Sequence, residues 1–438
     1  MLQEEWVKNM SDTTYEEIIK KGLSKRHAKE RRLKVYGILS ILFALSFLTI
    51  FIFTIFSNGY TALKQTQTLI SIQLPSDEIL DSNGKIDIKK SRAYNWDGLV
   101  KKSFRNYFPE VQKTSDKREL SNLISENAGY QLRLNIENGK FSVGDSVNAW
   151  VKTSDDVDML LKGLMNRDIE EKNRRLSDQQ IKWVDQLIKE KKVKLFFNSS
   201  FFTKADSREP ESAGILGAVV GSAFALLITL LLALPLAVMA AIYLEYFAKP
   251  GKITDFIEVN INNLAAVPSI VFGLLGLAVF IGFFGFPRSI PLVGGMVLAL
   301  MTLPTIIIAT RASIRAVPTS IRDAALGLGA SKMQTATDHI LPLAAPGILT
   351  GTIIGMAQAL GETAPLLLIG MVAFVVELPG SPLDPSASLP VQVYLWSESA
   401  ERGFVEKTSS TIMMLLGFLI VMNSLAVYAR QRFEKKWN

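Results

Sequence analysis

The sequence predicts an all-α polytopic membrane protein with six transmembrane helices and an α+β domain inserted between the first two helices. Six apolar segments are long enough to cross a bilayer, since a spanning helix needs roughly 20 residues. They cover residues 35–56, 213–243, 264–284, 291–309, 348–374 and 411–428. A polar block, residues 57–211, separates the first segment from the second and lowers the apolar fraction of the 438-residue chain to 48%.

The distribution of Lys and Arg beside these segments sets the expected orientation, because short cytoplasmic loops are rich in both residues. The basic tail, residues 1–34, is therefore expected in the cytoplasm, and six crossings return residues 431–438 to the same side. The block 57–211 then faces outward as an extracytoplasmic domain. The first segment lacks a small-residue cleavage pattern, so we expect a retained anchor rather than a cleaved signal peptide.

Composition argues against several kinds of site. The formal net charge is +7, but much of the excess lies beside the spans, which favours contact with membrane lipid over binding of nucleic acid. The chain has no cysteine, so it cannot form a disulfide, an iron–sulfur site or a thiolate-zinc site. No metal site is predicted.

The block 57–211 has about 155 residues, an ordinary size for one domain. Short runs of apolar residues predict strands at residues 69–74, 85–88 and 131–136. Asn83-Gly84 and Asn138-Gly139 are typical hairpin turns, and helical spacing of apolar residues predicts mainly helix over 155–192. No cluster of chemically active residues appears here, which favours a spacer or docking domain over a ligand-binding domain.

The segment between the fourth and fifth spans, residues 311–346, predicts two short helices. Ser320 followed by Asp323 predicts a helix N-cap at Ser320, with a carboxylate near the positive end of the helix dipole. The expected apolar face consists of Ile321, Ala324, Ala325 and Leu328.

Gly329 is expected to end the first helix of this segment, and Ser331 to cap a second helix that runs to Leu341. Pro342 and Pro346 then mark the turn back into the membrane. On physical grounds alone, these helices either insert into a groove of another protein or lie on the bilayer surface.

The string Asp323-Ala324-Ala325, then Gly329, then Leu341-Pro342 resembles the EAA loop of bacterial ABC-importer permeases. Asp323 replaces the usual Glu, and His339 stands where Ile is usual. In that family the loop receives mechanical work from a separate ATPase. The resemblance therefore implies ATPase-coupling roles for Ser320, Arg322, Asp323, Ala324, Ala325, Gly329, Leu341 and Pro342.

Further strings resemble one permease subunit of the bacterial phosphate ABC importers, in the long form that carries an extracytoplasmic domain. These strings are residues 242–246, 260–273, 303–311 and 361–367. The resemblance implies that residues 212–430 are a permease core of five transmembrane helices, which forms half of a translocation channel in the bacterial inner membrane.

The resemblance also implies the partners: a second phosphate permease subunit, an ATPase subunit dimer and an extracytoplasmic phosphate-binding protein. This chain lacks the Gly-x-x-x-x-Gly-Lys-Ser/Thr phosphate-binding pattern, so ATP and Mg²⁺ are expected on the ATPase, and this chain is expected to have no catalytic residue and no cofactor. The alternatives are a permease for another oxyanion, such as molybdate or sulfate, and, less favoured, a membrane-anchored sensor.

Glu362 is the principal candidate for the substrate pathway or a gate. It lies about 14 residues into the fifth predicted span, where a charged group costs about 3 kcal/mol unless it is paired or hydrated. The alternative is a helix–helix hydrogen bond from a protonated Glu. Gln358 and Thr363 lie beside it, and Gln358 stands where the family commonly has Arg. The compensating charge is therefore expected from Arg311, from the second permease or from a proton.

Small residues recur every four positions along the same span. They are Gly347, Gly351, Gly355, Ala359 and Thr363. Such a stripe predicts close packing against another helix, either in this chain or in the partner subunit.

Overall fold

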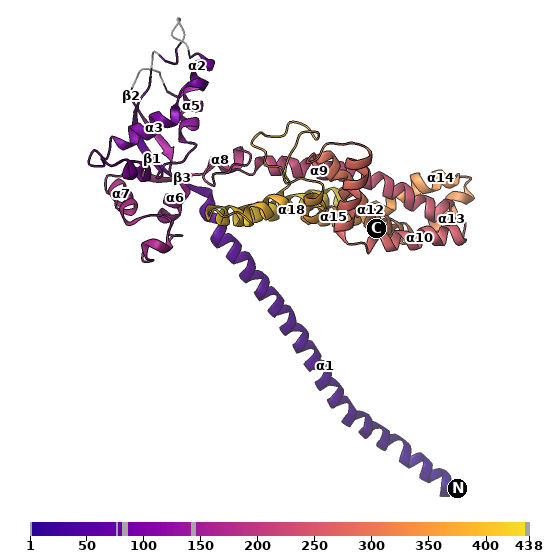
Figure 1. Ribbon diagram of the computed structural model, residues 1–438. Helices are drawn as coiled ribbons and strands as arrows, with labels where there is room; N and C mark the ends of the chain where they lie inside the picture. Colours follow the sequence, from indigo (N-terminus) through magenta and orange to yellow (C-terminus); the bar gives the residue numbers. More distant parts are fainter. Residues whose placement is uncertain (1, 76–77, 81–85, 142–145, 434–438) are drawn as a thin grey trace. The chain divides into compact units, whose positions relative to one another are not determined.

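The computed structural model describes residues 2–75, 78–80, 86–141 and 146–433, and it divides into two units, residues 1–57 and 58–438. The first unit consists of α1 (Leu2–Gly59), which runs on into the first residues of the second unit (Figure 1). The basic tail and the first predicted span thus form one continuous helix. Its side chains are exposed throughout residues 26–54.

The second unit begins with an α+β domain, which we call the polar domain (residues 60–211). Its three-stranded antiparallel sheet has the order β2-β1-β3. The strands are β1 (Lys64–Gln73), β2 (Ser146–Lys152) and β3 (Val193–Phe197). In this register Thr68 of the central strand lies opposite Val151 on one side and Val193 on the other.

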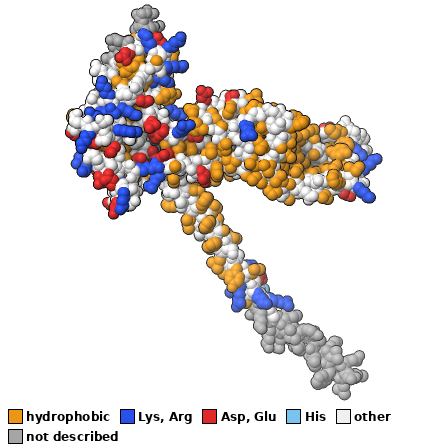
Figure 2. Space-filling view, viewed as in Figure 1, with side chains coloured by type: hydrophobic (Ala, Val, Ile, Leu, Met, Phe, Trp, Pro, Cys, Tyr) orange, Lys and Arg blue, Asp and Glu red, His pale blue; other side chains and the backbone are white. Residues whose placement is uncertain are grey.

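Short helices pack on this sheet and enclose an apolar core that includes Ile70, Phe104, Leu132 and Val184. The helices of the polar domain are η1 (Tyr60–Leu63), α2 (Ile88–Ala93), α3 (Trp96–Arg105), α4 (Thr114–Ser121), α5 (Ala128–Glu137), α6 (Asp155–Leu161), η2 (Glu171–Asn173), α7 (Asp178–Lys189) and α8 (Ser199–Thr203), of which η1, α2, η2 and α8 contribute no residue to this core. Figure 2 shows charged side chains gathered over the polar domain, whereas apolar side chains cover much of the visible membrane part.

Two of the predicted strands are wrong. Residues 131–136 lie in α5, because Leu132 and Ile136 are one helical turn apart and both are buried in the core. Gly139, with φ of +72°, then follows the end of this helix instead of forming a hairpin turn. Of residues 85–88, Ile86 forms only an isolated bridge to Leu80, and the Asn83-Gly84 turn lies outside the described residues.

In the described residues, five helices are long and apolar enough to cross a membrane, and a bent pair makes six if it counts as one span. The five are α1, α9 with η3 (Leu216–Ile242, Tyr243–Phe247), α12 (Pro291–Arg315), α14 with η5 and α15 (Lys332–Gln334, Thr335–Ile340, Leu341–Gly361), and α18 (Gly403–Phe433). The bent pair is α10 (Lys252–Ala265) and α11 with η4 (Ser269–Gly276, Leu277–Phe283). Shorter helices are α13 (Thr319–Gly327), α16 (Ala364–Leu368) and α17 (Leu389–Ser397).

Two of the predicted spans are broken in the structure. The chain turns by 101° between α10 and α11, at Pro268, which cannot donate a backbone hydrogen bond. The fifth predicted span, 348–374, is interrupted after Gly361, and α16 begins only at Ala364. Pro365 and Gly361 flank this break, and both residues disfavour a continuous helix.

The helix α12 packs closely against α15 through the small residues of α15. A Cβ atom at Gly351 would lie 2.2 Å from the Cβ of Ala309, and one at Gly347 would lie 2.2 Å from the Oγ of Ser313. The stripe therefore faces a helix of this chain. Gly355 continues the contact, and Ala359 is buried.

On its other side α12 contacts α9 at equally short range. A Cβ atom at Gly295 would lie 2.6 Å from the backbone oxygen of Ala225. The hydroxyl of Thr229 donates to the backbone oxygens of Ala225 and Gly295, at 2.8 Å and 3.1 Å. The helices α9, α12 and α15 form the core of the membrane part (Figure 1).

The polar domain is joined to the start of α18 by buried ion pairs. Lys162 Nζ lies 2.6 Å from a carboxylate oxygen of Asp158 and 2.6 Å from one of Glu406, and the three side chains are only 3%, 4% and 6% exposed. Asp158 also accepts a hydrogen bond from the backbone N–H of Thr66 in β1. The pKa of Lys162 is raised although burial opposes it, because the two carboxylates outweigh the burial.

We predict that Gly351→Leu reduces the amount of folded protein in the membrane at least severalfold. The added side chain overlaps Ala309 and forces α15 away from α12. Immunoblotting of detergent-extracted membranes checks this result. The matched control is Gly417→Leu in α18, because a Cβ atom there meets no heavy atom within 4 Å. Equal abundance of the two variants would contradict the packing argument.

We also predict that Lys162→Met lowers the melting temperature of the polar domain by about 10 °C. The substitution leaves Asp158 and Glu406 buried without their cation, a defect that costs about 3–5 kcal/mol. Thermal unfolding of the purified chain checks the shift, with Lys182→Met on the exposed face of α7 as the control. A melting temperature that falls equally little in both variants would contradict the assigned role of the ion pairs.

Candidate functional site

The first part of the candidate site is the break between α15 and α16. Glu362 has extended backbone angles, φ −79° and ψ 120°, directly after the last residue of α15. Its side chain is half-buried. Gln358 and Ile354 are exposed at one and two turns before it, so Gln358 and Glu362 share one face of α15. Thr363 precedes α16 and makes no capping hydrogen bond with its side chain.

In the described part of the chain, no ion pair neutralises Glu362, and Arg311 does not supply its compensating charge. Ala309 of α12 faces Gly351 of α15. The two helices run antiparallel, since Gly347 faces Ser313 in the same way. Arg311 lies two residues beyond Ala309 toward one end of the helix pair, and Glu362 lies eleven residues beyond Gly351 toward the other end. About 20 Å therefore separates them along the helix axes, so Arg311 is excluded as a direct partner of Glu362.

Arg311 instead belongs to an ion-pair cluster at the other end of the spans. Its Nε donates to the carboxylate of Glu245 at 2.7 Å, and its Nη2 donates to Glu258. Arg315 Nη2 lies 2.9 Å from the same Glu245. The cluster joins η3, α10 and α12, and the guanidinium of Arg322 lies 5.4 Å from the ring centroid of Tyr246, which adds α13.

Neither acidic partner of Arg311 is predicted from the sequence. Glu245 and Glu258 are 66 and 53 residues away from Arg311 in the sequence. Only their position beside apolar spans was a usable signal, because charges at a membrane boundary are often paired.

The second part of the candidate site is the connection between α12 and α15, which contains α13. The helix α13 begins at Thr319, with Pro318 as the residue before it and no side-chain cap. The prediction that Ser320 caps this helix is therefore wrong, because Ser320 already lies in the first turn. Gly329 has φ of +89° and ends α13 as predicted.

The predicted apolar face of α13 is only partly packed. Ala325 is 6% exposed and Ile321 is half-buried, whereas Ala324 and the charged Arg322 and Asp323 are exposed. Leu328 is 90% exposed and does not belong to the packed face. Singly exposed apolar side chains are normal on protein surfaces, so Leu328 by itself does not mark a contact with another protein.

The second predicted helix of this connection does not end at Leu341. Ser331 caps it in a reciprocal arrangement with Gln334, as predicted, but the helix continues without a turn into α15. A stretch of π-helix, Thr335–Ile340, ends two residues before Pro342. This wider turn accommodates the proline ring and its missing N–H, so the predicted turn at Pro342 and Pro346 is wrong. His339 is exposed.

Comparison with known families gives two matches. Residues 213–435 match the family described as binding-protein-dependent transport system inner membrane component. Residues 20–171 match a domain of unknown function, DUF3333.

Comparison with individual proteins gives relatives among ABC permeases. The probable ABC transporter permease protein YqgI of Bacillus subtilis is 35% identical to this chain over the matched residues. The match covers 38% of this chain and 56% of YqgI. The phosphate transport system permease protein PstA of Mycobacterium leprae is 32% identical over 48% of this chain and 68% of PstA. PstA 1 of Mycobacterium tuberculosis H37Rv is 30% identical, over 48% and 67%.

A solved structure of the inward-facing MetNI methionine ABC transporter aligns with 50% of this chain and 98% of that chain, at 16% identity and a TM-score of 0.40. The sequence relatives confirm the resemblance to phosphate-importer permeases. Together with the match over residues 213–435, they show that the chain belongs to the family of inner membrane components of binding-protein-dependent transport systems.

Proposed function

We propose that this chain is the permease subunit of an ATP-driven importer of inorganic phosphate and forms half of its translocation channel. The observation that carries the proposal is the similarity of the membrane part to PstA permeases over about half of this chain. ATP hydrolysis, and with it ATP and Mg²⁺, belongs to a separate ATPase dimer. A second permease subunit and an extracytoplasmic phosphate-binding protein complete the importer.

In this proposal both termini and the α12–α15 connection lie on the cytoplasmic side, and the polar domain lies outside. The exposed Leu328, Arg322 and Asp323 then face the ATPase. The ion-pair cluster of Arg311 supports a coupling role, because it ties the spans α9 and α12 to α10 beside the base of α13. A displacement of α13 is thereby transmitted to several helices together.

Glu362 and Gln358 line the channel in this proposal, on a face of α15 that the described chain leaves exposed. An ionised Glu362 repels a phosphate anion, so its role is that of a gate. The second permease subunit or a proton supplies the compensating charge, since Arg311 lies near the opposite end of the span. Interrupted helices beside a transport pathway are common in transporters.

The proposal predicts that cells without this gene lose high-affinity uptake of radiolabelled phosphate under phosphate limitation. Excess unlabelled phosphate should compete for the uptake in wild-type cells, whereas excess molybdate or sulfate should not. Restoring the gene on a plasmid controls for indirect effects. Uptake that does not change on deletion, in cells without a second phosphate importer, would contradict phosphate as the substrate, as would competition by sulfate or molybdate.

The gating role predicts that Glu362→Gln lowers phosphate uptake about tenfold, equivalent to about 1.4 kcal/mol, at unchanged membrane abundance. The substitution keeps the size of the side chain and removes its charge. Uptake and immunoblotting of the same membranes check both parts. Glu398→Gln, at an exposed position after α17, is the matched control. Equal phosphate uptake in the two variants would contradict the gating role.

A further inference from the structure

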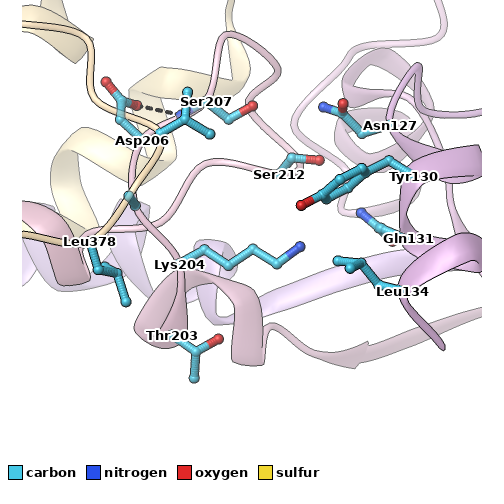
Figure 3. A pocket seen from close by; sticks show the side chains of 12 residues that line it. Asn127, Tyr130, Gln131, Leu134, Thr203, Lys204, Asp206, Ser207, Ser212 and Leu378 are labelled. Atoms are coloured by element: carbon cyan, nitrogen blue, oxygen red, sulfur yellow. Dashed lines mark hydrogen bonds between the residues drawn. The ribbon is translucent and has the colours of Figure 1, made fainter. Parts of the chain in front are cut away.

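A pocket of about 280 Å³ lies between α5 of the polar domain and two segments of the chain that border the membrane part (Figure 3). Its walls come from residues 127–134, 203–212 and 376–378. This volume is slightly below the range of about 300–1,000 Å³ that is typical of pockets for drug-sized ligands, so the pocket suits a small ligand. None of the residues described above for the two ion-pair clusters or for the break after α15 lines this pocket.

Four hydrogen-bond donors converge on this pocket, two from α5 and two from residues 203–212. Figure 3 shows the side chains of Lys204, Ser212, Tyr130 and Gln131 directed toward a common space. In the described residues, no carboxylate pairs with the ammonium group of Lys204. Burial lowers the pKa of Lys204, because nothing there offsets the cost of holding its charge away from water.

Two of these donors are buried without a partner. Ser212 is only 7% exposed, and its Oγ makes no hydrogen bond within the described chain. The Nε2 atom of Gln131 is likewise buried and unbonded there. Because a buried polar group without a partner costs about 1–3 kcal/mol, two such groups in residues that line one pocket favour a ligand that accepts hydrogen bonds.

The wall of the pocket also contains one carboxylate, which is hydrogen-bonded by neutral groups. The carboxylate of Asp206 accepts hydrogen bonds from Gln392 Nε2 and Trp396 Nε1, both at 3.0 Å, and from the backbone N–H of Ser207 at 2.8 Å. Figure 3 shows this carboxylate directed away from the space beside Lys204. Besides this hydrogen-bonded carboxylate, the polar side chains of the described residues that line the pocket are an ammonium group and neutral groups.

We propose that this pocket binds inorganic phosphate through the Lys204 ammonium group and the neutral donors of Ser212, Gln131 and Tyr130. A tetrahedral oxyanion presents oxygen acceptors in several directions, which matches donors arriving from two segments of the chain, α5 and residues 203–212. The proposal rests on the proposed function, since sulfate has the same shape. It assigns the polar domain a part in substrate binding, beyond that of a spacer.

The test is equilibrium binding of radiolabelled phosphate to the purified full chain in detergent, without ATPase or binding protein. We expect one saturable site. Lys204→Gln should weaken the binding at least tenfold and Ser212→Ala by about threefold, whereas Lys204→Arg should retain it. Lys182→Gln on α7 is the matched control and should leave the affinity unchanged. Unaltered melting temperatures of the variants separate lost binding from lost folding.

Three results would overturn the proposal: no saturable phosphate binding, affinity unchanged in Lys204→Gln, or binding of radiolabelled sulfate in place of phosphate. The outcome is separable from that of the proposed function. Phosphate binding that depends on Lys204 supports the pocket even where gene deletion leaves phosphate uptake intact. In the converse combination, gene deletion abolishes phosphate uptake while Lys204→Gln leaves the phosphate affinity unchanged. That combination supports the importer and contradicts the proposed pocket.

Discussion

The close packing of α12 between α9 and α15 is the constraint on which the rest of the membrane part depends. In a bilayer the hydrophobic effect does not drive helices together, so close contact between small residues has to do so. Gly295 provides this contact toward α9 and Gly351 toward α15. Once α12 is fixed, Arg311 at one end reaches Glu245 and Glu258, and the break after Gly361 is placed far from that cluster.

Charged side chains fix the two ends of this helical core in different ways. The Arg311 cluster is partly exposed and joins elements that border the α12–α15 connection. The Lys162 pairs are buried, and they join α6 of the polar domain to the start of α18. Buried ion pairs of this kind add little net stability relative to apolar packing, but they penalise any arrangement that separates the partners. The pairs therefore favour arrangements that keep α6 beside the start of α18.

The sequence predicted the features that depend on local pattern and missed those that depend on distant partners. The apolar segments, the polar block and the Ser331 cap could be predicted from the sequence, because each follows from composition or from residues within one turn. The strand predicted over 131–136 failed because Leu132 and Ile136 fit a helical face as well as a strand. Pro342 was read as a helix end because a π-helical turn leaves no signal in the sequence. The partners of Arg311 and the pocket around Lys204 come from segments brought together only by folding.

The position of Glu362 at a helix break changes the argument about its charge. In a continuous helix the backbone N–H and C=O groups around Glu362 would all be hydrogen-bonded. Here Glu362 follows the last turn of α15, whose carbonyl groups form the negative end of the helix dipole. A carboxylate and a negative helix end on one exposed face both disfavour an anion. The proposed Lys204 pocket has the opposite character, with a cation and unbonded donors. In the proposed importer, phosphate capture and phosphate gating therefore fall to different parts of the chain. A single residue could not perform both roles, because capture requires a positive charge that attracts the anion, whereas this gate carries a negative charge that repels it.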